Sequence, residues 1–140
     1  MTSKINAGVI IKCKDSVVLC KRITKFEGKS VSFGGYWAPF AGMVEEGESE
    51  QEAAARELYE ESGVKANPKS LIHLATFKKP HLFLYVYEVD DFPEIKLCTE
   101  HTDLGYFLIE HLKELPQDYK LDPKIIKSLQ AYQKNIPKKD

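Results

Sequence analysis

The stretch GMVEEGESEQEAAARELYEESGV, residues 42–64, contains the clearest helix in the chain. Ser49 is a good N-cap, and Glu52 follows three residues later, which is the spacing of a capping box. The interior that follows begins with three alanines and contains strong helix formers. Gly63 stands where a left-handed C-cap belongs. The pattern predicts a helix over residues 49–62.

One face of this predicted helix is acidic. Glu57, Glu60 and Glu61 are spaced i, i+3 and i+4, so they share one side of the helix. A divalent cation would turn their mutual repulsion into attraction, and hard ions such as Mg²⁺ prefer carboxylate oxygens and also bind substrate phosphates. The alternative is a solvated surface helix, because acidic helix faces are common.

Two details favour the metal site. Arg56 is the only basic residue of the helix, so its charges are not interlaced with opposite ones. The helix also follows a tight segment with two glycines, residues 41–48, which we expect to be a loop. Such a loop can bring backbone carbonyls close to an ion held by the helix.

The flanking sequence predicts strands around this helix and a second helix at the end. Runs rich in β-branched and alternating apolar residues predict strands over residues 5–13, 17–22, 36–40, 71–77, 82–89 and 104–108. Residues 26–35, which contain three glycines, predict a long loop. Residues 110–115 predict a short helical stretch, and Asp122 followed by Pro123 predicts the start of the last helix. The order of elements indicates a single mixed α/β sandwich, with a frayed tail over 134–140.

Composition excludes several classes of protein. The chain has 140 residues, and 20 basic against 21 acidic side chains give a formal net charge of −1, which argues against a generic polyanion binder. Three cysteines without close pairing, Cys13, Cys20 and Cys98, exclude a disulfide scaffold and fit a reducing compartment. The apolar run 5–11 is too short for a membrane span, so we expect a cytoplasmic protein without a membrane partner.

Glycine at 42, five residues, glutamate at 48, seven residues and then RELYEESGV at 56–64 resemble the complete signature of the Nudix hydrolase family. Every defined position is filled, and the chance of that at one start point is on the order of 10⁻¹⁰. The resemblance implies an α/β fold of the Nudix type, an α/β/α sandwich with a mixed central sheet. It also implies one Nudix domain over residues 1–140.

The resemblance further implies a metal-dependent pyrophosphohydrolase that cleaves a nucleoside diphosphate linked to another group. Mg²⁺, with Mn²⁺ as a possible substitute, would neutralise phosphate oxygens and activate a water molecule. Arg56 would orient Glu57 or pair with Glu48. The implied metal ligands are three carboxylates and one backbone carbonyl: Glu57, Glu60, Glu61 and Ala41.

The general base is left open between three acidic residues. Glu57 is one candidate, and the family often uses an acidic residue from a loop after the main strands, where Glu100 and Asp103 stand here. We favour Glu100. The alternative for Glu100 and Asp103 is an ordinary exposed loop carboxylate.

Candidate substrate-binding residues surround the signature. Arg22 ends a predicted strand and could bind a phosphate or a base edge. Phe33 and Tyr36 stand beside paired glycines and are candidates for a mobile base clamp, whereas core packing is the better interpretation of Trp37. Tyr85 lies on an alternating aromatic strand and faces either the pocket or the core.

The first expectation for the substrate is a (deoxy)nucleoside triphosphate, hydrolysed to the monophosphate and pyrophosphate. The alternatives are ADP-ribose or a nucleotide sugar, a dinucleoside polyphosphate, and the 5′ end of RNA. The near-neutral charge counts against RNA, although lysines around the first predicted hairpin could form a local basic patch. A remote alternative is a non-catalytic nucleotide-binding module. The sequence does not indicate an oligomeric state.

Overall fold

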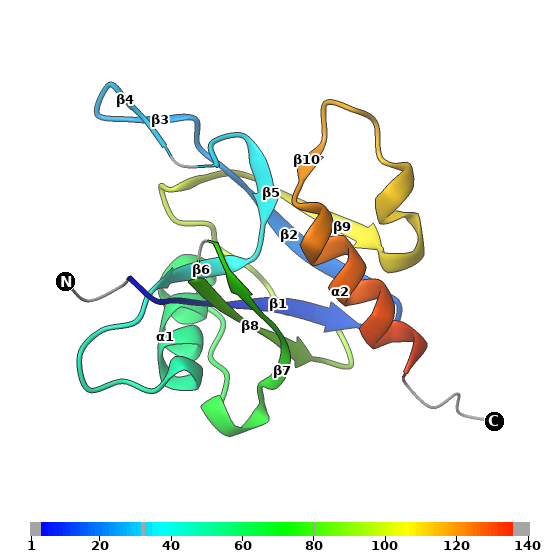
Figure 1. Cartoon of the computed structure of the whole chain (residues 1–140), viewed down its shortest axis with the longest axis horizontal. Helices are drawn as coiled ribbons and strands as arrows, with labels where there is room; N and C mark the ends of the chain where they lie inside the picture. Colours follow the sequence, from blue (N-terminus) through cyan, green and yellow to red (C-terminus); the bar gives the residue numbers. More distant parts are fainter. Residues whose placement is uncertain (1–3, 32, 80, 136–140) are drawn as a thin grey trace.

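A mixed, curled sheet of eight strands is the centre of the computed structural model, which describes residues 4–31, 33–79 and 81–135 (Figure 1). The strand order is β10-β5-β2-β1-β8-β7, with β6 paired to β1 and β9 paired to β2. The strands are β1 (Asn6–Cys13), β2 (Ser16–Arg22), β5 (Tyr36–Ala38), β6 (Phe40–Met43), β7 (Ile72–Lys78), β8 (His81–Glu88), β9 (His101–Leu108) and β10 (Lys120–Leu121). The parallel pairs are β1 with β8 and β5 with β10.

The sheet branches at β1. Residues 6–9 of β1 pair antiparallel with β6, and residues 11–13 pair antiparallel with β2. Because β6 and β2 occupy different parts of the same edge, the sheet divides there into two sets of strands. The chain crosses this division at Pro39, between β5 and β6.

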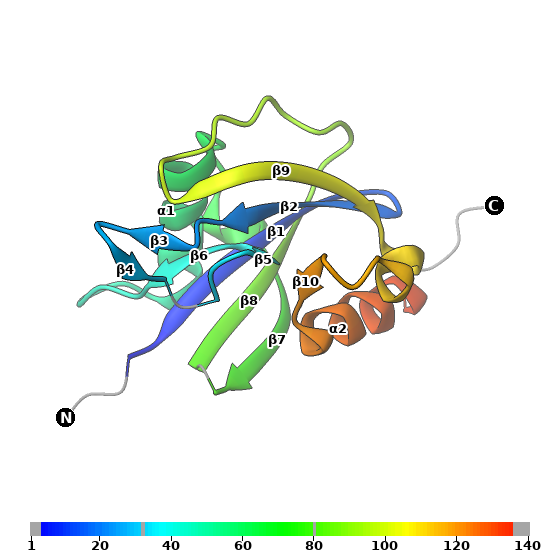
Figure 2. The same ribbon diagram turned by 90° about the horizontal axis from the view of Figure 1, so that it is seen from above.

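Helices cover both faces of the sheet (Figure 2). The helix α1 (Glu50–Ser62) packs on one face through Ala53, Ala54 and Leu58, which are fully buried. The helix α2 (Pro123–Lys134) and the 3-10 helix η2 (Ile109–Glu114) cover the other face. The sandwich of helix, mixed sheet and helix is therefore confirmed.

The helix ends follow the sequence. Ser49 and Glu52 form the capping box, and Gly63 closes α1 with a left-handed φ of 78°. Asp122 caps α2 with Pro123 in its first turn. A further 3-10 helix, η1 (Pro68–Ser70), follows α1. Among the described residues, no helix combines the length and the apolar character needed to cross a bilayer.

The prediction of one long loop over residues 26–35 is wrong in its first part. There β3 (Lys25–Phe26) and β4 (Lys29–Ser30) form a small hairpin that projects from the sheet (Figure 1). Glu27 and Gly28 both have positive φ, 52° and 79°, as the two central residues of a type I′ hairpin turn do. A glutamate before the glycine is an unusual signal for this turn, so the sequence did not reveal it.

Three strands, β6, β9 and β10, also differ from the prediction. Residues 41–43 belong to β6 and are not part of a loop, because they pair with β1. The strand β9 begins at His101, so Asp103 lies on a strand and Glu100 directly before it. The two-residue strand β10 was not predicted. Pro80, which the sequence places in an expected turn, and the tail from residue 136 onwards lie outside the described residues.

Candidate active site

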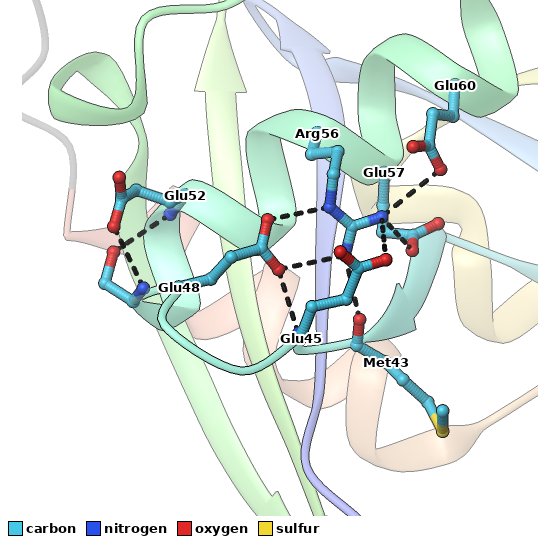
Figure 3. Close-up of polar contacts among 8 residues, drawn as sticks. Met43, Glu45, Glu48, Glu52, Arg56, Glu57 and Glu60 are labelled. Atoms are coloured by element: carbon cyan, nitrogen blue, oxygen red, sulfur yellow. Dashed lines mark hydrogen bonds and ion pairs between the residues drawn. The ribbon is translucent and has the colours of Figure 1, made fainter.

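Arg56 connects the acidic face of α1 to the segment that precedes the helix (Figure 3). Its Nε and Nη2 atoms donate to the two carboxylate oxygens of Glu48 at 2.7 and 3.0 Å, and Nη2 also donates to the carbonyl of Met43 at 2.9 Å. Its Nη1 atom donates to Glu57 Oε1 at 2.9 Å and to Glu60 Oε2 at 3.2 Å. The guanidinium thus contacts both Glu57 and Glu48.

These contacts favour the charged forms of Arg56 and Glu48. The hydrogen bond from Arg56 lowers the pKa of Glu48, and the carboxylates raise the pKa of Arg56. Glu48 also accepts a hydrogen bond from the backbone N–H of Glu45 at 2.9 Å. The segment that leads into α1 is therefore held to the helix by charged hydrogen bonds, which are stronger than neutral ones.

Gly42 is required by a close approach and not by its backbone conformation. It lies on β6, and a Cβ atom at this position would collide with the carboxylate of Glu57. The absent side chain leaves a cradle in which Glu57 lies against the strand. Any larger residue would displace this carboxylate.

Glu61 is a buried carboxyl, with a side chain 5% exposed. Burial first, and then the hydrogen bond and charge of Glu57 and the charge of Glu100, together raise its pKa to about 9, against a smaller opposing effect of the Ala41 backbone. Its Oε1 atom has no hydrogen-bond partner in the described part of the chain. A buried acidic oxygen without a partner is costly unless a cation compensates it.

The backbone of Ala41 faces the same group. In an antiparallel ladder, successive residues direct their N–H and C=O groups to opposite sides of the strand. Val44 N–H bonds to the carbonyl of Ile5, directly before β1, whereas the Met43 carbonyl turns away from β1 to Arg56. Ala41 stands two residues before Met43, so its carbonyl also points away from β1, on the side of α1.

The donor set fits a hard divalent cation, because it consists of carboxylate oxygens and one carbonyl. Across residues 4–31, 33–79 and 81–135, no three His, Cys, Asp or Glu side chains converge on one point as they stand. Arg56 draws Glu57 and Glu60 toward itself, as Figure 3 shows. A cation at this face would compete with Arg56 for these two carboxylates.

A cavity of about 520 Å³ borders β6, and Glu57, Glu60 and Glu61 are not among its lining residues. Ala41, Gly42 and Met43 of β6 form part of its wall. Four predicted site residues join them there: Arg22, Phe33, Tyr36 and Glu100. The structure therefore brings the expected phosphate- and base-binding side chains together with the strand that borders the acidic helix.

Two of the sequence candidates lie elsewhere. Tyr85 is buried in the core under α1, with its ring against His73 at 5.7 Å, and it is not part of the cavity wall. Asp103 on β9 lies opposite Lys21 on β2 in the register of the sheet, and it does not line the cavity either. Lys12, one of the lysines of the expected basic patch, is buried against Glu88 at 2.8 Å.

The sequence did not indicate the opposite wall of the cavity. It is built by the start of α2, by the β7–β8 pair and by the N-terminal segment, with Lys4, Asn6, Phe77, Leu82, Asp122, Lys124 and Ile125. Only the tertiary fold brings these segments together. No sequence pattern in these strands or in the first turn of α2 indicated that they lie beside the cavity.

A match to the family described as the NUDIX domain extends over residues 2–129. The chain belongs to the Nudix family. The matched region includes both walls of the cavity up to Ile125. It also includes the whole acidic face of α1, which is the Nudix helix of this protein.

Known Nudix proteins resemble the chain in sequence and in fold. The asymmetrical bis(5′-nucleosyl)-tetraphosphatase of Sus scrofa is 31% identical over 91 residues, which cover 59% of this chain and 62% of that protein. The match thus spans less than two thirds of that relative. The MutT protein of Methanosarcina mazei Go1 superposes with a TM-score of 0.70 at 18% identity, over 96% of each chain. A C. elegans Ap4A hydrolase superposes with a TM-score of 0.66 at 19% identity, over 92% of this chain and 96% of that one.

Proposed function

We propose that this Nudix protein is a divalent-metal-dependent hydrolase that cleaves a phosphoanhydride bond within a nucleotide. The observation that carries the proposal is the buried carboxyl of Glu61, which lacks a partner at Oε1 and stands behind the strand that borders the cavity. A structural carboxyl at such a place would be expected to have a hydrogen-bond donor. A cation that also binds phosphate accounts for both the acidic face and the adjacent cavity.

The residues that would hold Mg²⁺ are Glu57, Glu60 and Glu61 with the carbonyl of Ala41. When bound, the metal would neutralise phosphate oxygens and lower the pKa of water. Arg56 fixes the side chains of Glu57 and Glu60 before the ion arrives. The cationic side chains of Arg22, Lys4 and Lys124 line the cavity and suit the negative charge of a polyphosphate.

Glu100 is the best placed general base of the three candidates. It lines the cavity, and its backbone carbonyl accepts a hydrogen bond from Ile23 N–H at 3.0 Å, next to Arg22. Glu57 is already engaged by Arg56, and Asp103 lies away from the cavity. In this assignment Glu100 takes one proton from the attacking water, the new bond forms at phosphorus, and the bond to the bridging oxygen breaks.

The substrate class that the comparisons favour is a dinucleoside polyphosphate. Two of the proteins named above are described by this activity, a tetraphosphatase and an Ap4A hydrolase. The cavity wall carries aromatic side chains on several elements, with Phe33, Tyr36 and Trp37 near β5 and Phe77 on β7. Several aromatic faces in one cavity suit a ligand with two bases. A (deoxy)nucleoside triphosphate is the second candidate, because the same phosphate-binding arrangement would accept it.

The experiment is a substrate panel at fixed Mg²⁺ concentration, with products separated by ion-exchange chromatography. Diadenosine tetraphosphate should yield ATP and AMP, whereas a triphosphate substrate would yield the monophosphate and pyrophosphate. Glu61→Gln should reduce Mg²⁺-dependent turnover by several orders of magnitude while the protein remains folded. Glu110→Gln, at an exposed position on η2, makes the same charge change as a matched control and should retain full activity. Equal turnover by Glu61→Gln and the unmodified protein would refute the proposal.

A further inference from the structure

A closed set of contacts links Glu61 with Cys98 and His101. The backbone N–H of Cys98 donates to the backbone carbonyl of Glu61 at 3.2 Å. The Sγ atom of Cys98 lies 3.5 Å from Nδ1 of His101. The Nε2 atom of His101 lies 3.6 Å from Oε1 of Glu61. Main chain and side chain of the same glutamate are thus linked through two residues that lie far from it in the sequence.

This arrangement is fixed from several directions. Lys96 N–H bonds to the carbonyl of Ser62 at 2.9 Å, so the segment before β9 is attached to the last turn of α1. The N–H of His101 bonds to the carbonyl of Cys98 at 3.3 Å. The ring of Phe40 meets the His101 ring edge-on, at 6.0 Å and 80°. The imidazole therefore has little freedom to turn away from Glu61.

The two facing atoms are buried and without other partners. The side chain of His101 is fully buried, and neither its Nε2 atom nor Glu61 Oε1 has a hydrogen-bond partner in the described part of the chain. At 3.6 Å the two atoms are slightly too far apart for a hydrogen bond. Burial of an unused ring nitrogen costs free energy that an apolar side chain would avoid, so a role for this nitrogen is required.

The neighbour of the other ring nitrogen suits one tautomer. The Cys98 thiol can donate a weak hydrogen bond to Nδ1 when that atom carries no proton. In the neutral ring the proton then lies on Nε2 and points to Glu61. A small turn of the carboxylate closes the remaining gap.

We infer that His101 is a positioning residue for the metal ligand Glu61. The inference rests on the proposed function, because it concerns the form of Glu61 that a cation stabilises. When that carboxylate carries a negative charge, the bond from Nε2–H becomes charge-assisted and fixes one oxygen. The other oxygen is thereby free to face the metal. Hydrogen-bond partners of metal-binding side chains commonly orient them in this way.

The test is a titration of the protein with Mn²⁺ alone, followed by electron paramagnetic resonance, without nucleotide. His101→Gln places an amide N–H close to the position of Nε2, whereas His101→Asn places its amide nearer Nδ1 and His101→Phe has no donor. We expect His101→Phe and His101→Asn to weaken Mn²⁺ binding by roughly 10- to 100-fold. The Mn²⁺ affinity of His101→Gln should remain within about threefold of that of the unmodified protein, because this variant keeps a hydrogen-bond donor to Glu61. Thermal melting of each variant reports its folding.

The controls separate this inference from the proposed function. His111→Phe, at an exposed histidine on η2, should bind Mn²⁺ as the unmodified protein does. If Glu61→Gln loses Mn²⁺ but His101→Phe and His101→Asn do not, the positioning role is refuted and the proposed function stands. Equal weakening in all three His101 variants, His101→Gln included, would also refute it, because packing alone would then explain the loss. If Glu61→Gln binds Mn²⁺ normally, the proposed function itself fails.

Discussion

Glu61 is the residue on which the proposed function depends most. Its position four residues after Glu57 and directly after Glu60 made it a candidate from the sequence alone. The sequence could not reveal that it is buried or that His101 faces it, because both depend on the segment 96–101 that folds back onto the end of α1. No metal-ligand spacing of the histidines marks His101 in the sequence. Its place directly after Glu100 was the only available signal.

Removal of the metal should make stability depend on the ionisation of Glu61. Its pKa is raised from 4.5 to about 9 in the folded protein, so the folded state holds a proton that the unfolded state releases between these values. Without metal, this group therefore lowers the free energy of unfolding as the pH rises from about 4.5 to 9. Glu61→Gln should remove that part of the slope and be the more stable protein at pH 8 in EDTA.

The measurement is denaturant unfolding of both proteins from pH 5 to 9, in EDTA and in excess Mg²⁺. Comparison of the two proteins is essential because burial lowers the pKa of His101 to about 4, which weakens the fold in the opposite direction, toward acid pH. With Mg²⁺ the order should reverse, because only the unmodified protein gains free energy from binding. An unchanged difference between the two proteins across this pH range would contradict the account.

Phe33 combines an exposed aromatic ring with a strained backbone. Its φ is 58°, its side chain is 46% exposed, and it lines the cavity. A left-handed conformation costs a non-glycine residue about 1–2 kcal/mol, and its edge-on contact with Tyr36 returns roughly 0.5–1.5 kcal/mol. Phe33→Gly should therefore leave the melting temperature nearly unchanged and raise KM about tenfold, by the loss of one stacking interaction of about 1–3 kcal/mol. A variant with unchanged KM would remove Phe33 from the binding site.

At the scale of elements, local chemistry predicted the helices better than the strands. The caps of α1 and α2 are made by residues close in sequence to the backbone groups that they bond, so Ser49, Gly63 and Asp122 could all be predicted from the sequence. The strand β6 was not, because residues 41–43 become a strand only by pairing with β1. The hairpin of β3 and β4 and the start of β9 were missed for the same kind of reason. These strands form through pairing with partner strands, and no local sequence pattern predicts that pairing.

The two ends of α1 should affect stability alike and function differently. Ser49→Ala removes the capping box and should cost about 1 kcal/mol. Gly63→Ala forces a side chain onto a left-handed φ of 78° and should cost a similar amount, about 1 kcal/mol. Only Gly63 adjoins the turn that carries Glu61, so only Gly63→Ala should also weaken Mg²⁺ binding. Unfolding curves and Mg²⁺ titration calorimetry measure the two effects, and equal Mg²⁺ affinity in both variants would contradict this division.

At the scale of the whole molecule, the division of the sheet at β1 creates the cavity. The strand β6 leads from this division toward the acidic helix, and its residues 41–43 line the cavity, so the proposed phosphate-binding groups and the proposed metal ligand Ala41 share one wall. The sequence predicted this wall, because its residues lie in or near the signature. It did not predict the wall from α2 and the β7–β8 pair, which lies 35 and more residues away from Gly42 along the chain. In the proposed function this second wall contacts the substrate, so the substrate class was the property that the sequence predicted least.

The most direct test of the metal site is the anomalous diffraction of a crystal soaked in Mn²⁺. We predict a peak among Glu57, Glu60, Glu61 and the carbonyl of Ala41, with oxygen ligands at about 2.1 Å as for ions of this size. The carboxylate of Glu60 should have left Arg56 to reach the ion. A peak elsewhere, with Glu57 and Glu60 still bound to Arg56 in crystals that hydrolyse nucleotide, would contradict the account.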